Sequence, residues 1–195
     1  TLWSVAKLHG RSCESHTFAP EEKLISALTH RIVAVGDSLN NQELTNVLWA
    51  HATLGFEPND TVLAAISEKA ARGAPSFNPQ NIANTLWAFA KLRRTPDPCL
   101  LSALTERGTA VAHEFKPQEI ANTLWALAAL ALQPGEDLLS ALSSRATATA
   151  RQFNPQDCAN ILWSFATLSR APDDVLLHML TQQAARVAHK FEAQH

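Results

Sequence analysis

Tryptophan recurs with a fixed period along this 195-residue chain. It stands at four positions that are 38 residues apart and follow a leucine: Trp49, Trp87, Trp125 and Trp163. Trp3 continues the series but lies 46 residues before Trp49, eight more than the period, so we expect an insertion within residues 10–18. A period between about 20 and 50 residues is the signature of a protein built from stacked repeats. We therefore compare equivalent positions of successive repeats.

The repeat from 77 to 114 has the pattern of two helices. Asn78 and Pro79 suit the N-cap and the first position of a helix, and apolar residues at helical spacing continue to about Leu92. After a proline-bearing turn, Asp97 is expected to cap a second helix. That helix would direct four apolar residues inward: Leu100, Leu101, Leu104 and Val111.

Neither helix can bury its apolar stripe alone, so neighbouring repeats must stack. The sequence therefore predicts an all-α fold, an α-solenoid of tandem antiparallel helix pairs with a 38-residue repeat. We expect one array over 1–195 that is a segment of a longer chain. It would contain a partial repeat 1–38, repeats 39–76, 77–114, 115–152 and 153–190, and the start of a further repeat at 191–195.

Small residues mark the positions where helices are expected to approach closely. Gly108 lies in a column with Ala70 and Ala146 on the second helix, and alanine or serine follows each later tryptophan. A glycine inside a helix costs stability, so close packing against a neighbour is its expected reason. We interpret the large tryptophan side chains as wedges between helices, with base stacking as the less favoured alternative.

Composition and motifs limit the range of functions. The formal charge is −2, with 46% hydrophobic residues and three cysteines that form no CxxC pair. No apolar run is long enough to cross a membrane. Phosphate-binding loops, nucleophile elbows and metal-binding histidine motifs are all missing from the sequence. We predict a protein that is not an enzyme, with no cofactor, no metal, no membrane contact and no small-molecule substrate.

Three close copies and two looser ones carry a shared motif, seen as FNPQNIANTLWAFAKL over 77–92. In period and motif the chain resembles the octotricopeptide repeat, a helical-pair family found mainly in green algae. It departs from that family at the start of the second helix, where only the first proline of the family's P-P-P-E-W is kept, as at Pro96. The resemblance implies an organelle protein, mitochondrial or chloroplast, that binds RNA. Its role would be in RNA processing, stability or translation, or as a ribosome-associated component.

Two amide columns do not vary among the repeats. They are a glutamine column (Gln42, Gln80, Gln118, Gln156) and an asparagine column four residues later (Asn46, Asn84, Asn122, Asn160). Identical residues cannot distinguish different bases, so we interpret them as ladders between stacked repeats that satisfy buried backbone groups. The alternative is a uniform grip on an RNA backbone, since backbone contacts carry no sequence information.

The column between the two amides does vary, and it yields the base-facing candidates Glu43, Asn81, Glu119 and Asp157, with Thr85 and Thr123 one turn further. Carboxylates and amides differ in donors and acceptors, as base recognition requires. The structural alternative is stronger for this column. It falls at the third helical position, where an acidic or amide residue completes a capping box.

A basic column lies on the second helix, and it supplies the RNA-backbone candidates Arg31, Lys69, Arg107 and Arg145, with Gln183 in the last repeat. One positive charge per repeat would form a row of phosphate contacts with strong salt dependence. The alternative is a solubilising edge of the buried face.

Two hypotheses about function follow from the sequence. The chain is either an RNA-binding helical-repeat protein of an organelle, or a scaffold that binds mainly proteins within an assembly such as a mitochondrial ribosome.

Overall fold

The computed structural model describes residues 4, 6–7, 27, 29 and 39–188. Eight α-helices, three short 3-10 helices and no strand occur within 39–188. Their bounds are α3 (Asn41–Leu54), α4 (Asp60–Gly73), α5 (Pro79–Lys91), α6 (Pro98–Ala110), α7 (Pro117–Ala129), α8 (Glu136–Thr149), α9 (Pro155–Thr167) and α10 (Asp174–Val187). Each odd-numbered helix and the helix after it fall within one 38-residue unit. Trp3, Arg31 and the expected insertion within 10–18 lie outside the described residues.

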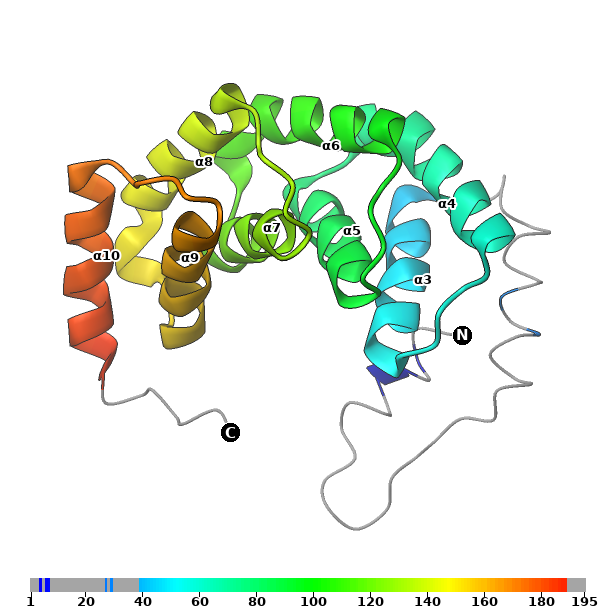
Figure 1. The fold of residues 1–195 in the computed structure, drawn as a ribbon, viewed down its shortest axis with the longest axis horizontal. Helices are drawn as coiled ribbons and strands as arrows, with labels where there is room; N and C mark the ends of the chain where they lie inside the picture. Colours follow the sequence, from blue (N-terminus) through cyan, green and yellow to red (C-terminus); the bar gives the residue numbers. More distant parts are fainter. Residues whose placement is uncertain (1–3, 5, 8–26, 28, 30–38, 189–195) are drawn as a thin grey trace, which may run out of the picture.

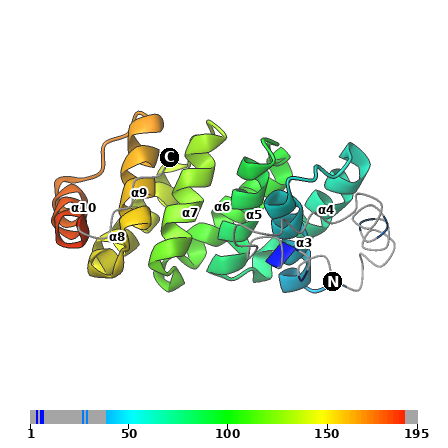
Figure 2. The ribbon, with the colours of Figure 1, turned by 90° about the horizontal axis from the view of Figure 1, so that it is seen from below.

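The helices form two curved layers (Figure 1). Helices α3, α5, α7 and α9 make the inner, concave layer, and α4, α6, α8 and α10 make the outer arch. Within each layer a helix packs against the helix of the next repeat, as α7 packs between α5 and α9, and Figure 2 shows the helix pairs side by side along the array. The predicted all-α helical-repeat solenoid is confirmed.

Caps define where the helices begin. The Asn81 amide N–H donates to Asn78 Oδ1 at 2.9 Å at the start of α5, and the Leu100 N–H donates to Asp97 Oδ1 at 3.0 Å at the start of α6. Both predicted caps are therefore confirmed. Asn40, Asn59, Asn154 and Asp173 cap other helices in the same way, so short polar side chains set the start of six of the eight described α-helices, the exceptions being α7 and α8.

A left-handed residue ends every inner helix, six positions after the tryptophan. It is Gly55 in the first described repeat, with φ of 68°, and then Arg93, Ala131 and Ser169, each with φ of 54°. The next amide donates back across the turn, as from Arg94 N–H to the Phe89 carbonyl at 3.0 Å. This is the Schellman arrangement. It was missed in the sequence because three of the four residues are not glycine.

The core lies between the two layers. Leu100, Leu104 and Val111 of the repeat 77–114 are buried as expected, whereas Leu101 is only half-buried, at the edge of that stripe. Phe77, Phe115 and Phe153 are fully buried where one repeat passes into the next. Buried apolar side chains thus run without interruption from repeat to repeat.

Small residues do mark close approach. A Cβ added at Gly108 would lie 3.1 Å from Leu138 Cδ1 of α8, so the absent side chain makes room for the neighbouring outer helix. In the inner layer, the residues that follow each tryptophan have no exposed surface: Ala50, Ala88, Ala126 and Ser164. Both predictions of close packing are confirmed.

Candidate functional site

The two amide columns lie on the concave side of the inner layer. In α5, Gln80, Asn84 and Trp87 share one face, opposite the buried stripe that contains Ile82 and Phe89. The glutamines are exposed and the asparagines are half-buried. We call this set the amide row: Gln42, Asn46, Gln80, Asn84, Gln118, Asn122, Gln156 and Asn160. It crosses all four inner helices.

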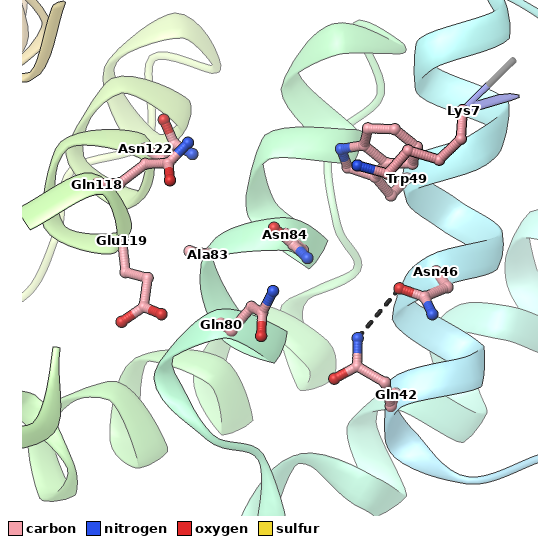
Figure 3. A pocket seen from close by; sticks show the side chains of 10 residues that line it. All are labelled: Lys7, Gln42, Asn46, Trp49, Gln80, Ala83, Asn84, Gln118, Glu119 and Asn122. Atoms are coloured by element: carbon pink, nitrogen blue, oxygen red, sulfur yellow. Dashed lines mark hydrogen bonds between the residues drawn. The ribbon is translucent and has the colours of Figure 1, made fainter. Parts of the chain in front are cut away.

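Side chains of α3, α5 and α7 line a groove of about 350 Å³ along the amide row (Figure 3). Three of its glutamine–asparagine pairs contribute, together with Trp49. The ionisable side chains of the described lining are Lys7 and Glu119, one of each charge. The groove is therefore polar but close to neutral.

Hydrogen bonds within the amide row run along single helices. Gln42 Nε2 donates to Asn46 Oδ1 at 3.0 Å, and Gln156 Nε2 donates to Asn160 Oδ1 at 2.8 Å. In the middle repeats, the side chains of Gln80, Asn84, Gln118 and Asn122 make no hydrogen bond to any residue that the structure describes. Their donors and acceptors face solvent.

The expected amide ladder between stacked repeats is not observed. Among the described residues, the amide row makes one hydrogen bond to another inner helix, from Asn81 Nδ2 to Gln42 Oε1 at 3.4 Å. The reason is geometric, because residues four apart share one face of a helix, and this face is the one directed away from the core. The alternative, a uniform grip on an RNA backbone, stays a prediction.

The tryptophans border the amide row and are only partly wedges. Trp49 and Trp87 stack with ring centroids 6.4 Å apart, and both pack against the core while staying half-buried. Trp163 is 45% exposed. Lys91 Nζ lies 5.8 Å from the Trp87 ring centroid, and Lys7 Nζ lies 5.2 Å from that of Trp49. The rings hold neighbouring helices together and also present surface along the concave side.

The base-facing column forms capping boxes. Backbone amides donate to the side chains of Glu43, Asn81, Glu119 and Asp157 over distances of 2.9, 3.3, 2.8 and 3.1 Å. Asn81 and Asp157 are buried, Glu43 is exposed, and Glu119 is half-buried at the groove. Burial raises the pKa of the Asp157 carboxyl, although the hydrogen bond with the Asn154 backbone opposes the shift. These contacts favour the structural interpretation of the column.

Thr85 and Thr123 lie in the interior and have no exposed surface. Thr85 Oγ1 donates to the Asn81 carbonyl at 2.8 Å, and Thr123 Oγ1 has no hydrogen-bond partner among the described residues. The prediction that these two threonines face bases therefore does not fit their position. They occupy the flank of the helix, where small residues allow the inner helices to pack.

The basic column donates hydrogen bonds within the protein. Arg107 Nε donates to the Phe77 carbonyl and Arg145 Nε donates to the Phe115 carbonyl, both at 2.8 Å. Gln183 Nε2 donates to the Phe153 carbonyl at 2.6 Å. A neutral glutamine thus makes the same contact as the arginines, which favours a structural role for the column. Lys69 is half-buried, Arg31 lies outside the described residues, and phosphate contact by the column stays a prediction.

A variable column on the concave side was missed. It lies four residues after each tryptophan and contains Thr53, Lys91, Ala129 and Thr167. The 38-residue period contained the signal, because this column lies one turn beyond each tryptophan and two turns beyond each asparagine of the amide row, on the same side of the helix.

Two further observations concern metal binding and membrane spans in the described residues. They contain no group of three or more histidine, cysteine, aspartate or glutamate side chains that could hold a metal ion. None of their helices has the length and apolar character needed to cross a membrane.

Comparison with known proteins identifies the family. No curated protein matches the chain. The family model that matches is described as RNA-editing substrate-binding complex 6 protein, and it covers residues 15–195. It is not the octotricopeptide model that the motif suggested, although the helical-repeat part of that prediction is confirmed. With most of its length matched and the helical-repeat architecture in place, the chain belongs to the RNA-editing substrate-binding complex 6 protein family.

Proposed function

We propose that this protein is a non-catalytic component of the RNA-editing substrate-binding complex, where it holds RNA within an RNA-processing assembly. The family supplies the assembly and implies both protein and RNA partners. That complex is mitochondrial, so we place the protein in the mitochondrion rather than in the chloroplast. We also propose that its 38-residue units are of the octotricopeptide type, on the basis of period and motif.

The observation that carries the proposal is the amide row beside the tryptophans. Glutamine and asparagine side chains repeat on the four described inner helices, those of α3, α5 and α7 line a groove, and tryptophan rings with open surface border them. Surfaces that bind single-stranded nucleic acid commonly combine polar contacts along the strand with aromatic stacking. The long concave side of a solenoid suits an extended ligand of this kind.

Photo-crosslinking of the full chain to a labelled single-stranded RNA tests this proposal. Crosslinked peptides are expected from the inner helices, in particular those that contain Trp87, Trp125 and Trp163. The outer helices α6 and α8 serve as the internal control, because they lie on the opposite side of the array. Absence of crosslinks, or crosslinks confined to α6 and α8, would contradict RNA binding on the concave side.

A protein scaffold is the second candidate function. The near-neutral groove and the internal contacts of Arg107 and Arg145 favour it. In that case the chain would keep its partners in mitochondrial extracts after ribonuclease treatment. An RNA-holding component would instead lose those partners that it contacts through RNA, so affinity purification with and without ribonuclease separates the two functions.

A further inference from the structure

The amide row offers a more specific conclusion, which rests on the proposed function. We infer that it recognises the ribose hydroxyl groups of a single RNA strand, repeat by repeat, without reading base identity. The protein would then distinguish RNA from DNA by the sugar and tolerate any base sequence.

The uniformity of the row is the first step. The same glutamine and asparagine occur in all four described repeats, and their side chains lie on the same face of each inner helix. Bases change along an RNA strand, whereas the sugar–phosphate backbone is the same at every nucleotide. A uniform row of contacts therefore matches the part of the ligand that does not change.

The chemistry of the amides is the second step. Gln80, Asn84, Gln118 and Asn122 keep their side-chain donors and acceptors free of partners among the described residues. A primary amide offers two donor hydrogens and one acceptor oxygen. A ribose 2′-hydroxyl is both donor and acceptor, and it is the group by which a protein tells RNA from DNA. A phosphate only accepts, so it would leave the amide oxygens unused.

Charge is the third step. Neutralisation of phosphates by lysine and arginine releases counterions, which makes binding fall steeply with salt. The described lining of the groove carries one cation and one anion, Lys7 and Glu119. The arginines of the basic column donate instead to carbonyls at the junctions between repeats. The groove is built for hydrogen bonding to neutral groups, so its contribution to binding should depend only weakly on salt.

The tryptophans add a contact that is equally indifferent to sequence. Every base has a π-face, so stacking on an aromatic ring tolerates all four bases. Trp163, with 45% of its surface exposed, is the most open of the four tryptophans in the described part of the chain. Ribose contacts on one turn of the helix and stacking on the next would hold each nucleotide by its constant features.

The test compares RNA and DNA of identical sequence by fluorescence anisotropy with the full chain. The variant carries Gln80→Ala, Asn84→Ala, Gln118→Ala and Asn122→Ala, four changes on the solvent side of α5 and α7. The matched control carries Ser140→Ala and Ser144→Ala on the exposed side of the outer helix α8. Circular dichroism melting of all three proteins establishes that each is folded.

The native chain and the control are expected to prefer RNA over DNA by about tenfold or more, since a few ordinary hydrogen bonds are worth at least that factor. The variant should lose the preference through weaker RNA binding, with its DNA affinity unchanged. Oligo(A) and oligo(U) should bind the native chain within about threefold of each other, since no base edge is read. Replacing the RNA by its 2′-O-methyl form, which keeps the acceptor oxygen but loses the donor hydrogen, should weaken binding to a level between those of RNA and DNA.

Equal affinity for RNA and DNA in the native chain, or a variant that loses both to the same extent, would overturn ribose recognition while leaving the RNA-holding function intact. A native chain that binds no RNA would overturn the proposed function itself. A strong preference for one homopolymer would show base reading and contradict the inference as well.

Discussion

The inner and outer layers of the solenoid differ in how they use their repeated residues. The inner helices pack through fully buried small residues such as Ala88 and Ala126, and they direct an invariant set of amides to the concave surface. The outer helices pack through the column of Ala70, Gly108 and Ala146, and they use their repeated arginines for contacts with buried junctions. A repeated polar residue therefore faces solvent in the inner layer, whereas in the outer layer it forms hydrogen bonds within the protein.

This difference shows that repetition alone does not identify a functional surface. The basic column repeats and looks like a ligand site, yet its described members at 107, 145 and 183 satisfy backbone carbonyls. The amide row also repeats, and the side chains of its middle members make no hydrogen bond to any described residue. What separates the two columns is whether their hydrogen-bonding groups already have partners.

Tight packing of the inner layer predicts the largest loss of stability on substitution. Ala126→Leu in α7 should lower the free energy of unfolding by about 3 kcal/mol, because a fully buried alanine between neighbouring helices has no room for three more carbon atoms. The same change at half-buried Ala103 of the outer helix α6 should cost less than about 1 kcal/mol. Urea unfolding measures both. Equal losses would remove the distinction between the two layers.

The junction contacts of the outer layer predict the next effect. Arg145→Ala should lower the free energy of unfolding by about 2 kcal/mol, since it removes the charged donor to the Phe115 carbonyl. Arg145→Gln should lose less than half as much, because Gln183 makes the equivalent contact in the next repeat. Thermal and urea unfolding of both variants provide the measurement. If glutamine is no better than alanine, the column acts through charge rather than through this hydrogen bond.

The left-handed residues at the ends of the inner helices predict that one substitution will increase the stability of the protein. Ala131→Gly should raise the free energy of unfolding by about 0.5–1 kcal/mol, because alanine at φ of 54° is strained and glycine is not. Ala129→Gly, two residues earlier in the last turn of α7, is the control and should lower stability instead. A loss at both positions would show that the turn does not need the left-handed conformation.

His51 predicts the smallest effect, a dependence on pH. It replaces the Phe89, Leu127 and Phe165 of later repeats, and burial lowers its pKa below the ordinary value. Its ring contacts Thr29 Oγ1 at 3.1 Å and the Phe56 carbonyl at 3.0 Å. Since the unfolded chain takes up the proton first, stability should be complete above about pH 6.5 and fall as the pH drops below it. His51→Phe should remove this dependence in urea unfolding measured at several pH values.

Much of the fold follows from local patterns that are visible in the sequence. The 38-residue period, the caps at Asn78 and Asp97 and the buried stripes all depend on interactions within one or two turns of a helix. The ends of the inner helices are harder to predict from the sequence. Arg93, Ala131 and Ser169 adopt a left-handed conformation there, which is usually found at glycine. There the geometry of the turn between packed helices overrides the preference of the residue.

The sequence by itself determined that the chain is an all-α array, where its helices begin, and which positions repeat. Only the tertiary structure decided which repeating columns face solvent, because curvature arises from packing between repeats and places the first helix of each pair on the concave side. Thr85 and Gln80 lie in one helix, two and seven residues before Trp87, and the first is buried whereas the second is exposed. Burial depends on which helices pack nearby, and the sequence of a single helix does not give the position of its neighbours.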